Sequence, residues 1–345
     1  MSNFKVNGGH VLVFGDLHFS DVFTGRHKNY LQNCFRVLGD MSNLIDSKNP
    51  SAIVLLGDIV GWLETNVRNR EVLSMLCRIF RDWSKNGTRP IFAVKGNHDI
   101  KGYPEFLFLS ELGLLVTSAQ CDGYFDYYSG ENGKHEARFH IVDYNCESRE
   151  LQLPEDDNVS NIVLGHNNYT IQGYTNWYQE HNGIELGLLQ NYANVDMVIS
   201  GHIHAPSPEI YYATMPGGKT CGLLYTGCPT RPIKDKPVYE SCWVVDIYFS
   251  NETGFTEIDT IKMDLQPASE LFYDDTEFIE DKADEDIQEE LRKEALMDVL
   301  GDMLKYRMGH GDPIEQIDKI PNASVEAKAV AKSYLQQALN NSQSA

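Results

Sequence analysis

The sequence is poor in positive charge. Its 345 residues include 29 Lys and Arg against 50 Asp and Glu, which gives a formal net charge of −21. Proteins that grip long nucleic acids alone usually display a basic surface that displaces counterions from phosphates. The densest basic stretches here, residues 68–70 and 231–236, are short. We therefore expect either that the substrate is not a long polyanion, or that metal ions and a partner supply the positive charge.

Paired cysteine motifs and long apolar runs are also missing. The seven cysteines are scattered and include no Cys-x-x-Cys pair, which favours reduced thiols over a disulfide framework. No apolar run approaches the length of a membrane span, and no basic segment followed by an apolar one opens the sequence. These features predict a soluble, cytoplasmic protein.

Short runs rich in Val, Ile and Leu alternate with helical patterns in the first two-thirds of the chain. Buried strands are predicted at residues 11–14, 53–56, 91–94, 162–164 and 195–199. Residues 28–46 and 72–83 carry apolar side chains at helical spacing. Later runs at 137–142, 222–226, 242–249 and 256–263 read as strands without intervening helices. This pattern predicts a layered α/β fold with a second sheet packed on the first, and a ligand site at the carboxyl ends of the strands.

The composition changes near residue 270. Residues 270–290 are dominated by Asp and Glu, with Lys282 as the only cation, and helical patterns follow at 286–308 and 323–340. We predict a catalytic domain over residues 1–268, an acidic linker over 269–285 and a helical region over 286–345.

Residues that can bind metal ions follow each predicted strand. They are Asp16 and His18, Asp58, Asn97 with His98 and Asp99, His166, and finally His202 and His204. Side chains two residues apart point to the same side of an extended segment, so each Asp-x-His or His-x-His pair can face one point. Each motif alone is more often a turn or a cap. Their recurrence after successive buried strands favours a site for two divalent ions, with one bridging carboxylate.

The series DLH, GD, GNHD, GH and GHIH resembles the motifs of the calcineurin-like metallophosphoesterase family over roughly residues 10–230. The resemblance implies a four-layer α/β/β/α sandwich with two metal ions, commonly Mn²⁺ in the nuclease branch. It implies that one ion is bound by Asp16, His18, Asp58 and His204. Asp58 would bridge to a second ion held by Asn97, His166 and His202. His98 matches the family residue that contacts the scissile phosphate or protonates the leaving oxygen, and Asp99 would orient it.

Features outside the motif series indicate which branch of the family this chain resembles. Protein phosphatases carry an Arg shortly after the second motif and usually GNHE in the third, whereas this chain has neither. The acidic linker, the C-terminal helices and the segment YTGCPTR at 225–231 resemble SbcD-type subunits of the SbcCD recombination nuclease, including bacteriophage relatives. That resemblance implies DNA as substrate, mainly in complex, and an SbcC-like ABC-type ATPase docked on the helices. It is also compatible with a homodimer, and it implies that the protein acts in the cytoplasm of a bacterial cell or a phage-infected host.

Departures from the SbcD pattern keep the alternatives open. Val60 and Gly61 stand where those proteins usually have an aromatic residue followed by Asp or His, and Phe19 and Ser20 replace a Leu-Gly pair. Residues 233–270 also leave little room for a DNA-capping domain. The main hypothesis is a manganese-dependent DNA exo/endonuclease subunit. The alternative is a stand-alone metallophosphatase or a phosphodiesterase for cyclic nucleotides or other small molecules. A non-enzymatic scaffold is disfavoured because every ligand position is filled.

Overall fold

A computed structural model of the chain describes residues 4–19, 30–60, 69–100, 104–129, 133–171, 183–230 and 239–272. The chain divides into two units, Met1–Phe272 and Tyr273–Ala345. The second unit lies outside the described residues. The predicted helical docking region and nearly all of the predicted acidic linker fall there, so both stay predictions.

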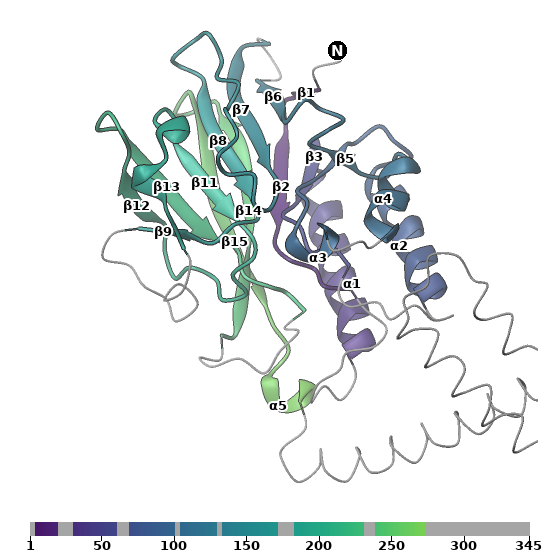
Figure 1. Ribbon diagram of the computed structural model, residues 1–345. Helices are drawn as coiled ribbons and strands as arrows, with labels where there is room; N and C mark the ends of the chain where they lie inside the picture. Colours follow the sequence, from purple (N-terminus) through teal and green to yellow (C-terminus); the bar gives the residue numbers. More distant parts are fainter. Residues whose placement is uncertain are drawn as a thin grey trace, which may run out of the picture. The chain divides into compact units, whose positions relative to one another are not determined.

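The first sheet has six strands in the order β15-β14-β2-β3-β4-β5 (Figure 1). Their bounds are β2 His10–Phe14, β3 Ala52–Leu55, β4 Ile91–Ala93, β5 Val116–Thr117, β14 Ser241–Ser250 and β15 Phe255–Asp264. Strands β2 to β5 pair in parallel, while β14 pairs antiparallel with both β2 and β15. The central strands are almost entirely apolar, as expected where both faces of a parallel sheet are covered.

The second sheet has seven strands in the order β1-β6-β7-β8-β11-β13-β12. Their bounds are β1 Lys5–Asn7, β6 Tyr124–Tyr128, β7 His135–Val142, β8 Ser160–Gly165, β11 Met197–Ser200, β12 Tyr211–Thr214 and β13 Thr220–Tyr225. Strands β7, β8, β11 and β13 are parallel neighbours, and β6 and β12 pair with them antiparallel. Both sheets are therefore mixed.

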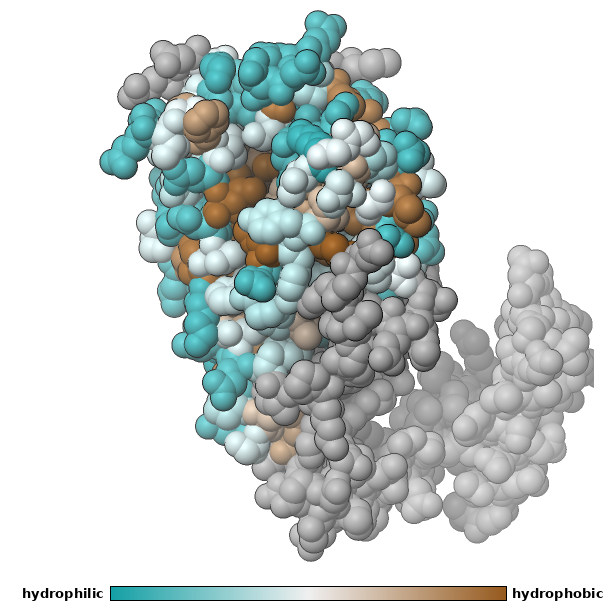
Figure 2. Space-filling view, turned by 90° about the vertical axis from the view of Figure 1, so that its left-hand side faces the viewer, coloured by the Kyte–Doolittle hydropathy of each residue, from teal (hydrophilic) through white to brown (hydrophobic). Residues whose placement is uncertain are grey.

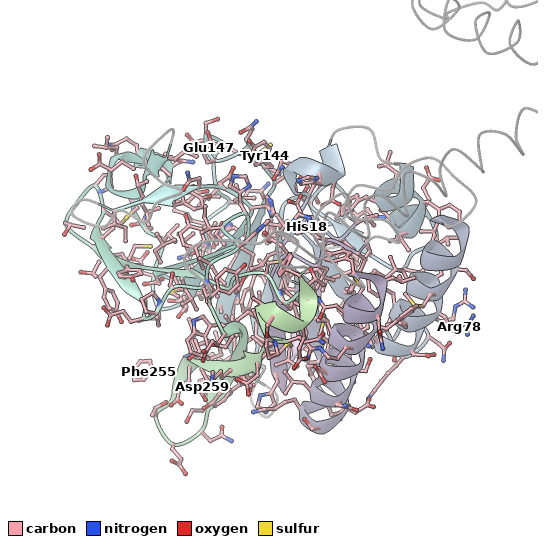
Figure 3. The ribbon with its side chains drawn as sticks, turned by 90° about the horizontal axis from the view of Figure 1, so that it is seen from below. His18, Arg78, Tyr144, Glu147, Phe255 and Asp259 are labelled. Atoms are coloured by element: carbon pink, nitrogen blue, oxygen red, sulfur yellow. The ribbon has the colours of Figure 1, made fainter. Side chains whose placement is uncertain are left out.

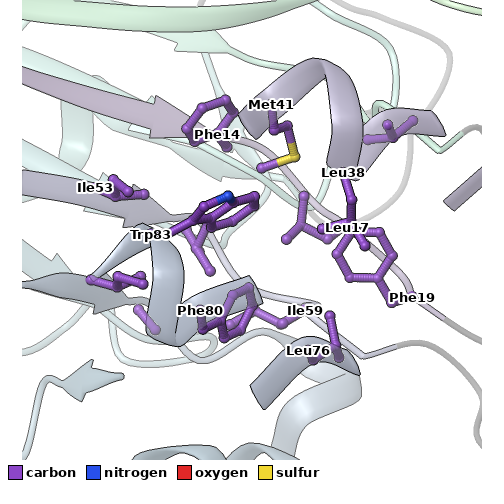
Figure 4. Packing of buried hydrophobic residues seen from close by; sticks show 14 of the residues in the cluster. Phe14, Leu17, Phe19, Leu38, Met41, Ile53, Ile59, Leu76, Phe80 and Trp83 are labelled. Atoms are coloured by element: carbon purple, nitrogen blue, oxygen red, sulfur yellow. The ribbon is translucent and has the colours of Figure 1, made fainter. Parts of the chain in front are cut away.

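Helices cover the outer face of the first sheet. They are α1 Tyr30–Lys48, α2 Asn69–Trp83 and α4 Pro104–Glu111, with the short α3 Asn97–Ile100 and α5 Ala268–Leu271 at other positions. In α1 the buried side chains recur every three or four residues, which presents one apolar face to the sheet. Phe14 of β2, Met41 of α1 and Trp83 of α2 meet in this core (Figure 4). Burial of such side chains contributes about 1.5–3 kcal/mol each.

A second core lies between the two sheets. The rings of Phe92, Phe125 and Phe139 stack there, with centroids 3.8 Å and 4.7 Å apart. Phe92 belongs to β4 of the first sheet, and the other two belong to β6 and β7 of the second. Packing in this core holds the two sheets face to face.

The outer face of the second sheet departs from the predicted α/β/β/α layering. Its apolar side chains are covered by the 3₁₀ helices η1 Leu186–Leu188 and η2 Gln190–Tyr192 and by the strand pair β9 Tyr169–Thr170 and β10 Ile184–Glu185. Among the residues that the structure describes, no α-helix covers this face. The described connection between Gly183 and β11 forms η1 and η2 instead. Figure 2 shows apolar side chains there within a polar surround.

The assignment of strands to sheets also differs from expectation. The late strands β14 and β15 extend the first sheet through β2, whereas β8 and β11 belong to the second sheet. The α/β fold with two packed sheets is confirmed. No helix in the described part of the chain is both long and apolar enough to span a bilayer.

Candidate metal centre

The predicted site residues lie together where strands of both sheets end. The carboxyl ends of β2, β3 and β4 come from the first sheet, and those of β8 and β11 come from the second. His166, after β8, places Nδ1 3.5 Å from Oδ1 of Asp16, which follows β2. Figure 3 shows His18 deep between the two sheets. Face-to-face packing of the sheets therefore joins motifs that are far apart in the sequence.

One cluster consists of Asp16, His18 and His204, whose ligand atoms all lie within 4.8 Å of one another. The Nε2 atoms of His18 and His204 are 3.0 Å apart. Oδ2 of Asp16 lies 3.9 Å from Nε2 of His204. These are three of the four ligands predicted for the first ion, and the fourth, Asp58, is not a member of this cluster.

A second cluster consists of Asp16, Asp58 and His166. Nε2 of His166 lies 3.2 Å from Oδ2 of Asp58 and 3.0 Å from Oδ1 of Asn97. The same Asn97 oxygen lies 2.9 Å from Nδ1 of His202. His202 therefore faces Asn97 while His204 faces His18, and their division between two ions stays a prediction.

Asp58 belongs to the second cluster and also lies close to His18 of the first. Its Oδ2 atom lies 3.6 Å from Nε2 of His18 on one side and 3.2 Å from Nε2 of His166 on the other. The side chain is 2 % exposed. A carboxylate placed in this way can contact two ions, as predicted for the bridging ligand.

The donor geometry fits divalent cations. Two ligand atoms at right angles around an ion, with bonds of about 2.1 Å, stand about 3.0 Å apart. The Nε2 atoms of His18 and His204 have this separation. The Nδ1 atom of His204 is buried and makes no hydrogen bond within the described part of the chain. Nδ1 of His166 lies 2.6 Å from the carbonyl of Leu56, which suits donation there and leaves Nε2 free as a ligand.

Unusual backbone conformations hold these side chains in place. His18, Asp58 and His202 have φ angles of 47°, 43° and 73°, in the left-handed region that costs non-glycine residues about 1–3 kcal/mol. Hydrogen bonds stabilise these loops. His18 N–H donates to the Asp58 carbonyl at 2.7 Å, and His202 N–H donates to Oδ2 of Asp16 at 2.9 Å. Strain of this kind is typical of functional sites.

Glycine is required where the ligand loops touch. Gly57 has a φ of +99°, and a Cβ there would lie 2.6 Å from Nδ1 of His166. A Cβ on Gly96 would overlap the carboxylate of Asp58. The glycines that follow β3 and precede α3 therefore allow the two loops to approach closely.

In the metal-free chain, the charges of the buried site carboxylates and of His166 depend on one another. Burial raises the pKa of Asp16 to about 7. Burial also favours neutral Asp58, but the charge and hydrogen bond of His166, with His18 and His98, outweigh it and hold the pKa of Asp58 well below its usual value. Burial opposes a proton on His166, yet Asp58 and Asp16 raise the pKa of His166 to about 9. A proton on His166 thus offsets the carboxylates, and a bound cation would replace it.

Three further imidazoles of the site have a lowered pKa, which favours their neutral form. Burial lowers the pKa of His18 well below its ordinary value, helped by His204. Burial, with His166, lowers the pKa of His202 to about 4, and burial lowers that of His204 to about 4. Neutral imidazoles are the form that binds metal ions.

His98 lies at the exposed side of the clusters. Its side chain is 16 % exposed, and its Nε2 atom lies 3.9 Å from Oδ2 of Asp58. Its backbone N–H donates to Oδ1 of Asp58 at 2.8 Å. Asp99 is buried, and its Oδ2 atom accepts a hydrogen bond from Gly96 N–H at 2.9 Å. Asp99 therefore braces the loop that carries His98, and its predicted role in orienting the imidazole stays a prediction.

Sequence reasoning missed the side chains that support the first ligand loop from behind. Cys228 Sγ donates to the Asp16 carbonyl at 3.2 Å, and Thr230 Oγ1 donates to the Leu17 carbonyl at 2.8 Å. Tyr30 donates to the carbonyl of His18 at 2.8 Å. It also missed Tyr144, whose ring centroid lies 5.4 Å from that of His202. Tyr30 and Tyr144 carry no local motif, because long-range packing alone brings them to the site. Cys228 and Thr230 lie in the segment 225–231, whose sequence did not indicate this supporting role.

Solved structures with a related arrangement share little sequence with this chain. One described as a dimetal phosphatase from Danio rerio is 13 % identical and covers 75 % of this chain and 99 % of its own, with a TM-score of 0.45. The protein TT1561 of Thermus thermophilus is 11 % identical over 73 % of this chain and 99 % of its own, with a TM-score of 0.38. Similarities this low transfer no activity to the chain. No curated protein sequence matches it significantly.

The family assignment comes from the sequence match to a family model. A model described as calcineurin-like phosphoesterase matches residues 9–206, which is more than half of the 345 residues. The matched range ends just after His204 and includes all the predicted site residues. The chain therefore belongs to the calcineurin-like phosphoesterase family and is a metal-dependent phosphoesterase.

Proposed function

We propose that this chain alone hydrolyses phosphate esters of small molecules, as a phosphatase or a small-molecule phosphodiesterase with two divalent ions. The observation that carries the proposal is the position of the Asp58 carboxylate, whose Oδ2 atom lies close to both His18 and His166, one imidazole from each proposed ligand set. All the donors come from the unit Met1–Phe272. The donor set therefore needs neither the C-terminal unit nor a partner chain to be complete.

The residues divide into two ligand sets. Asp16, His18, Asp58 and His204 would hold one ion, and Asp58 would share a second with Asn97, His166 and His202. A mixed set of imidazole, carboxylate and amide donors suits divalent first-row ions, and Mn²⁺ is the proposed metal. Such ions lower the pKa of bound water and neutralise charge on a phosphoryl group.

His98 is the proposed group that donates a proton to the leaving oxygen or contacts the phosphate. The Asp58 carboxylate fixes the backbone N–H of His98, so the imidazole is held beside the ligands without being enclosed by them. Partial exposure at the open side of the clusters gives it access to an ester oxygen. A positioned acid of this kind contributes about 10²–10⁴-fold to a rate.

The charge of the chain supports a small substrate. A net charge of −21 repels a long polyanion at distances within the Debye length, about 8 Å at physiological salt. A small phosphate ester presents only one or two charges, which bound cations can offset locally. This argument favours small esters over free duplex DNA for the isolated chain.

The second candidate is the DNA exo/endonuclease subunit of an SbcCD-like complex. The turn that resembles those nucleases, residues 225–231, contributes Cys228 and Thr230, which hydrogen-bond to the backbone of the Asp16 loop. In this reading an SbcC-like ATPase supplies the cationic surface that the chain lacks. The proposed docking helices lie outside the described residues.

A substrate panel tests the proposal. The full-length chain loaded with Mn²⁺ is assayed on p-nitrophenyl phosphate, bis(p-nitrophenyl) phosphate, a 2′,3′-cyclic nucleotide and single-stranded DNA, with Asp58→Asn as the inactive control. We expect hydrolysis of at least one small ester that chelation and the control variant abolish. Cleavage of DNA with no turnover of small esters would replace the first candidate by the second. A chain inactive on all four substrates would contradict the proposed function.

A further inference from the structure

The loop after β7 places an aromatic ring against the second ligand set. The ring centroid of Tyr144 lies 5.4 Å from that of His202 and 6.2 Å from that of His166. The family motifs do not include this loop. Figure 3 shows Tyr144 and Glu147 on it. Tyr144 is half-buried, so one side of the residue packs against the site while the other is open.

Hydrogen bonds tie this loop to two of the ligand loops. Tyr144 N–H donates to the carbonyl of Lys95 at 2.9 Å, and Lys95 N–H donates to Oδ1 of Asp143 at 2.8 Å. Lys95 immediately precedes the Gly96–Asp99 turn. On the other side, Asn145 N–H donates to Oδ1 of Asn167 at 2.9 Å, next to His166. The position of the Tyr144 ring is therefore fixed relative to the ligands of the second ion.

The outer part of the loop is fixed as well. Nδ2 of Asn191 donates to the carbonyls of Glu147 and Arg149, at 2.8 Å and 2.7 Å. The guanidinium of Arg149 donates to the carbonyl of Asp122 at 3.1 Å. A loop that is bonded at both ends holds its backbone in one arrangement, which gives a binding residue a fixed base.

The hydroxyl of Tyr144 has no hydrogen-bond partner among the described residues, unlike the phenols buried nearby. Tyr169 and Tyr192 bond to each other at 3.0 Å, and Tyr225 donates to the Tyr169 carbonyl at 2.7 Å. Phenol hydroxyls in folded proteins usually find a partner. An accessible, unused donor beside predicted metal ligands is therefore available to a bound molecule.

The geometry points to Tyr144 as a substrate-binding residue, whose hydroxyl donates a hydrogen bond to a phosphoryl oxygen of the ester. This inference rests on the proposed function and adds a residue that the family motifs do not contain. A neutral phenol suits this position because a phosphoryl group close to bound cations still has oxygen atoms that need donors. Packing against His202 sets the direction of the phenol, and the hydroxyl makes the contact.

The test compares Tyr144→Phe, which keeps the ring, with Tyr144→Leu, which removes it. Tyr212→Phe is the matched control, because Tyr212 is 66 % exposed on the edge strand β12. Each full-length chain is loaded with Mn²⁺ and measured for metal content, for kcat and KM on the two p-nitrophenyl esters, and for the Kd of orthophosphate by calorimetry.

We expect Tyr144→Phe to retain its metal, to lose about 10- to 100-fold in kcat/KM and to bind orthophosphate correspondingly more weakly, the usual effect of losing a hydrogen bond to a charged group. Tyr212→Phe should match the wild type. Unchanged kinetics and phosphate binding in Tyr144→Phe would overturn the inference. So would a loss of metal in Tyr144→Phe that parallels its loss of rate, since the hydroxyl would then support the ligands and not contact the substrate.

The phosphate titration separates this inference from the proposed function. If the wild type is inactive on both esters but binds orthophosphate more tightly than Tyr144→Phe does, the inference stands and the proposed activity on these esters fails. If the two chains bind orthophosphate equally, or neither binds it, the inference is wrong whatever the activity.

Discussion

The Nε2 atoms of His18 and His204 lie 3.0 Å apart, although 186 positions separate the residues in the sequence. Burial lowers the pKa of both imidazoles, which favours the neutral form, and two neutral rings at this separation need a lone pair on at least one of the facing nitrogens. A cation that accepts both lone pairs suits this arrangement better than a single shared proton, because Asp16 also faces the same point. The contact is thus the most direct structural indication of a metal position.

Removal of one metal-ligand histidine should therefore cost about one metal ion per chain. We expect the wild type to bind close to two Mn²⁺ ions per chain, and His204→Ala and His202→Ala each to lose about one, because the two histidines belong to different proposed ligand sets. Elemental analysis after loading and desalting measures this. His135→Ala is the control, since His135 on β7 pairs with Asp126 away from the site. Unchanged stoichiometry in both site variants would contradict the ligand assignment.

His98 should contribute to chemistry more than to metal binding. His98→Asn is expected to keep both ions and to lose about 10²–10⁴-fold in kcat, the usual contribution of a positioned acid. Steady-state kinetics together with metal analysis of the same samples check this. His98 also forms a cluster with His18 and Asp58. A variant that loses one ion along with its activity would show that His98 is a ligand.

Gly96 should tolerate no side chain. A Cβ there would overlap the carboxylate of Asp58, so Gly96→Ala should displace the proposed bridging ligand and reduce both metal content and rate. Gly39→Ala is the control, because a Cβ on Gly39, in α1, would meet no atom within 4 Å outside its own helical turn. That change should stabilise the protein by about 0.5–1 kcal/mol. Normal metal content in Gly96→Ala would mean that the two ligand loops can move apart.

The pH dependence of stability should include a contribution from His140 of β7. Burial lowers the pKa of His140 to about 4, and its Nε2 atom lies 3.2 Å from Oδ1 of Asn161. Between pH 4 and 6.5 the unfolded chain binds more protons at this residue, so stability rises with pH through that window and is lost as the pH falls. Protonation of His140 should therefore lower the free energy of unfolding by about 3 kcal/mol as the pH falls through this window.

A His140→Gln variant tests this assignment. Denaturant unfolding of the wild type and the variant, both with chelator present, should show a smaller loss of stability in the variant between pH 6.5 and 4. The difference in the pH-dependent loss of unfolding free energy between the two chains gives the contribution of His140 alone, because the other buried groups that titrate in this range are present in both. Parallel pH profiles would assign the dependence to those groups instead.

The C-terminal unit should be dispensable for the chemistry. Because the donor set lies within Met1–Phe272, deletion of residues 281–345 is expected to leave manganese-dependent hydrolysis of a small diester within about twofold of the wild type. In the nuclease reading, the same deletion should abolish co-purification with an SbcC-like ATPase. An unfolded deletion variant would show that the tail belongs to the core. Retained ATPase binding would place the contact elsewhere.

Local pattern alone was enough to locate the strands and the polar residues after them. The runs at 11–14, 53–56 and 195–199 correspond to β2, β3 and β11, since continuous apolar stretches are typical of strands buried on both faces. The Asp, Asn and His residues that follow them also identified the family, which the match over residues 9–206 confirms. Both signals lie within a few residues, so neither depends on how the sheets are arranged.

Which strands pair with which could not be determined from the sequence. β14 joins the first sheet beside β2, and β8 lies in the second, because backbone hydrogen bonds are the same for any partner and the choice depends on how whole faces pack. The helical layer predicted outside the second sheet is absent from the described residues for a related reason. The motif series contains no information about the connections that cover that face.

The sequence by itself determined which residues can bind metal, because imidazole, carboxylate and amide groups have that chemistry wherever they lie. Only the tertiary structure decided how they meet. It brings His18 to His204, places Asp58 between His18 and His166, and sets Tyr144 against His202. These contacts depend on two sheets clamped face to face and on left-handed backbone at three ligands, and such long-range geometry leaves no trace in local residue patterns.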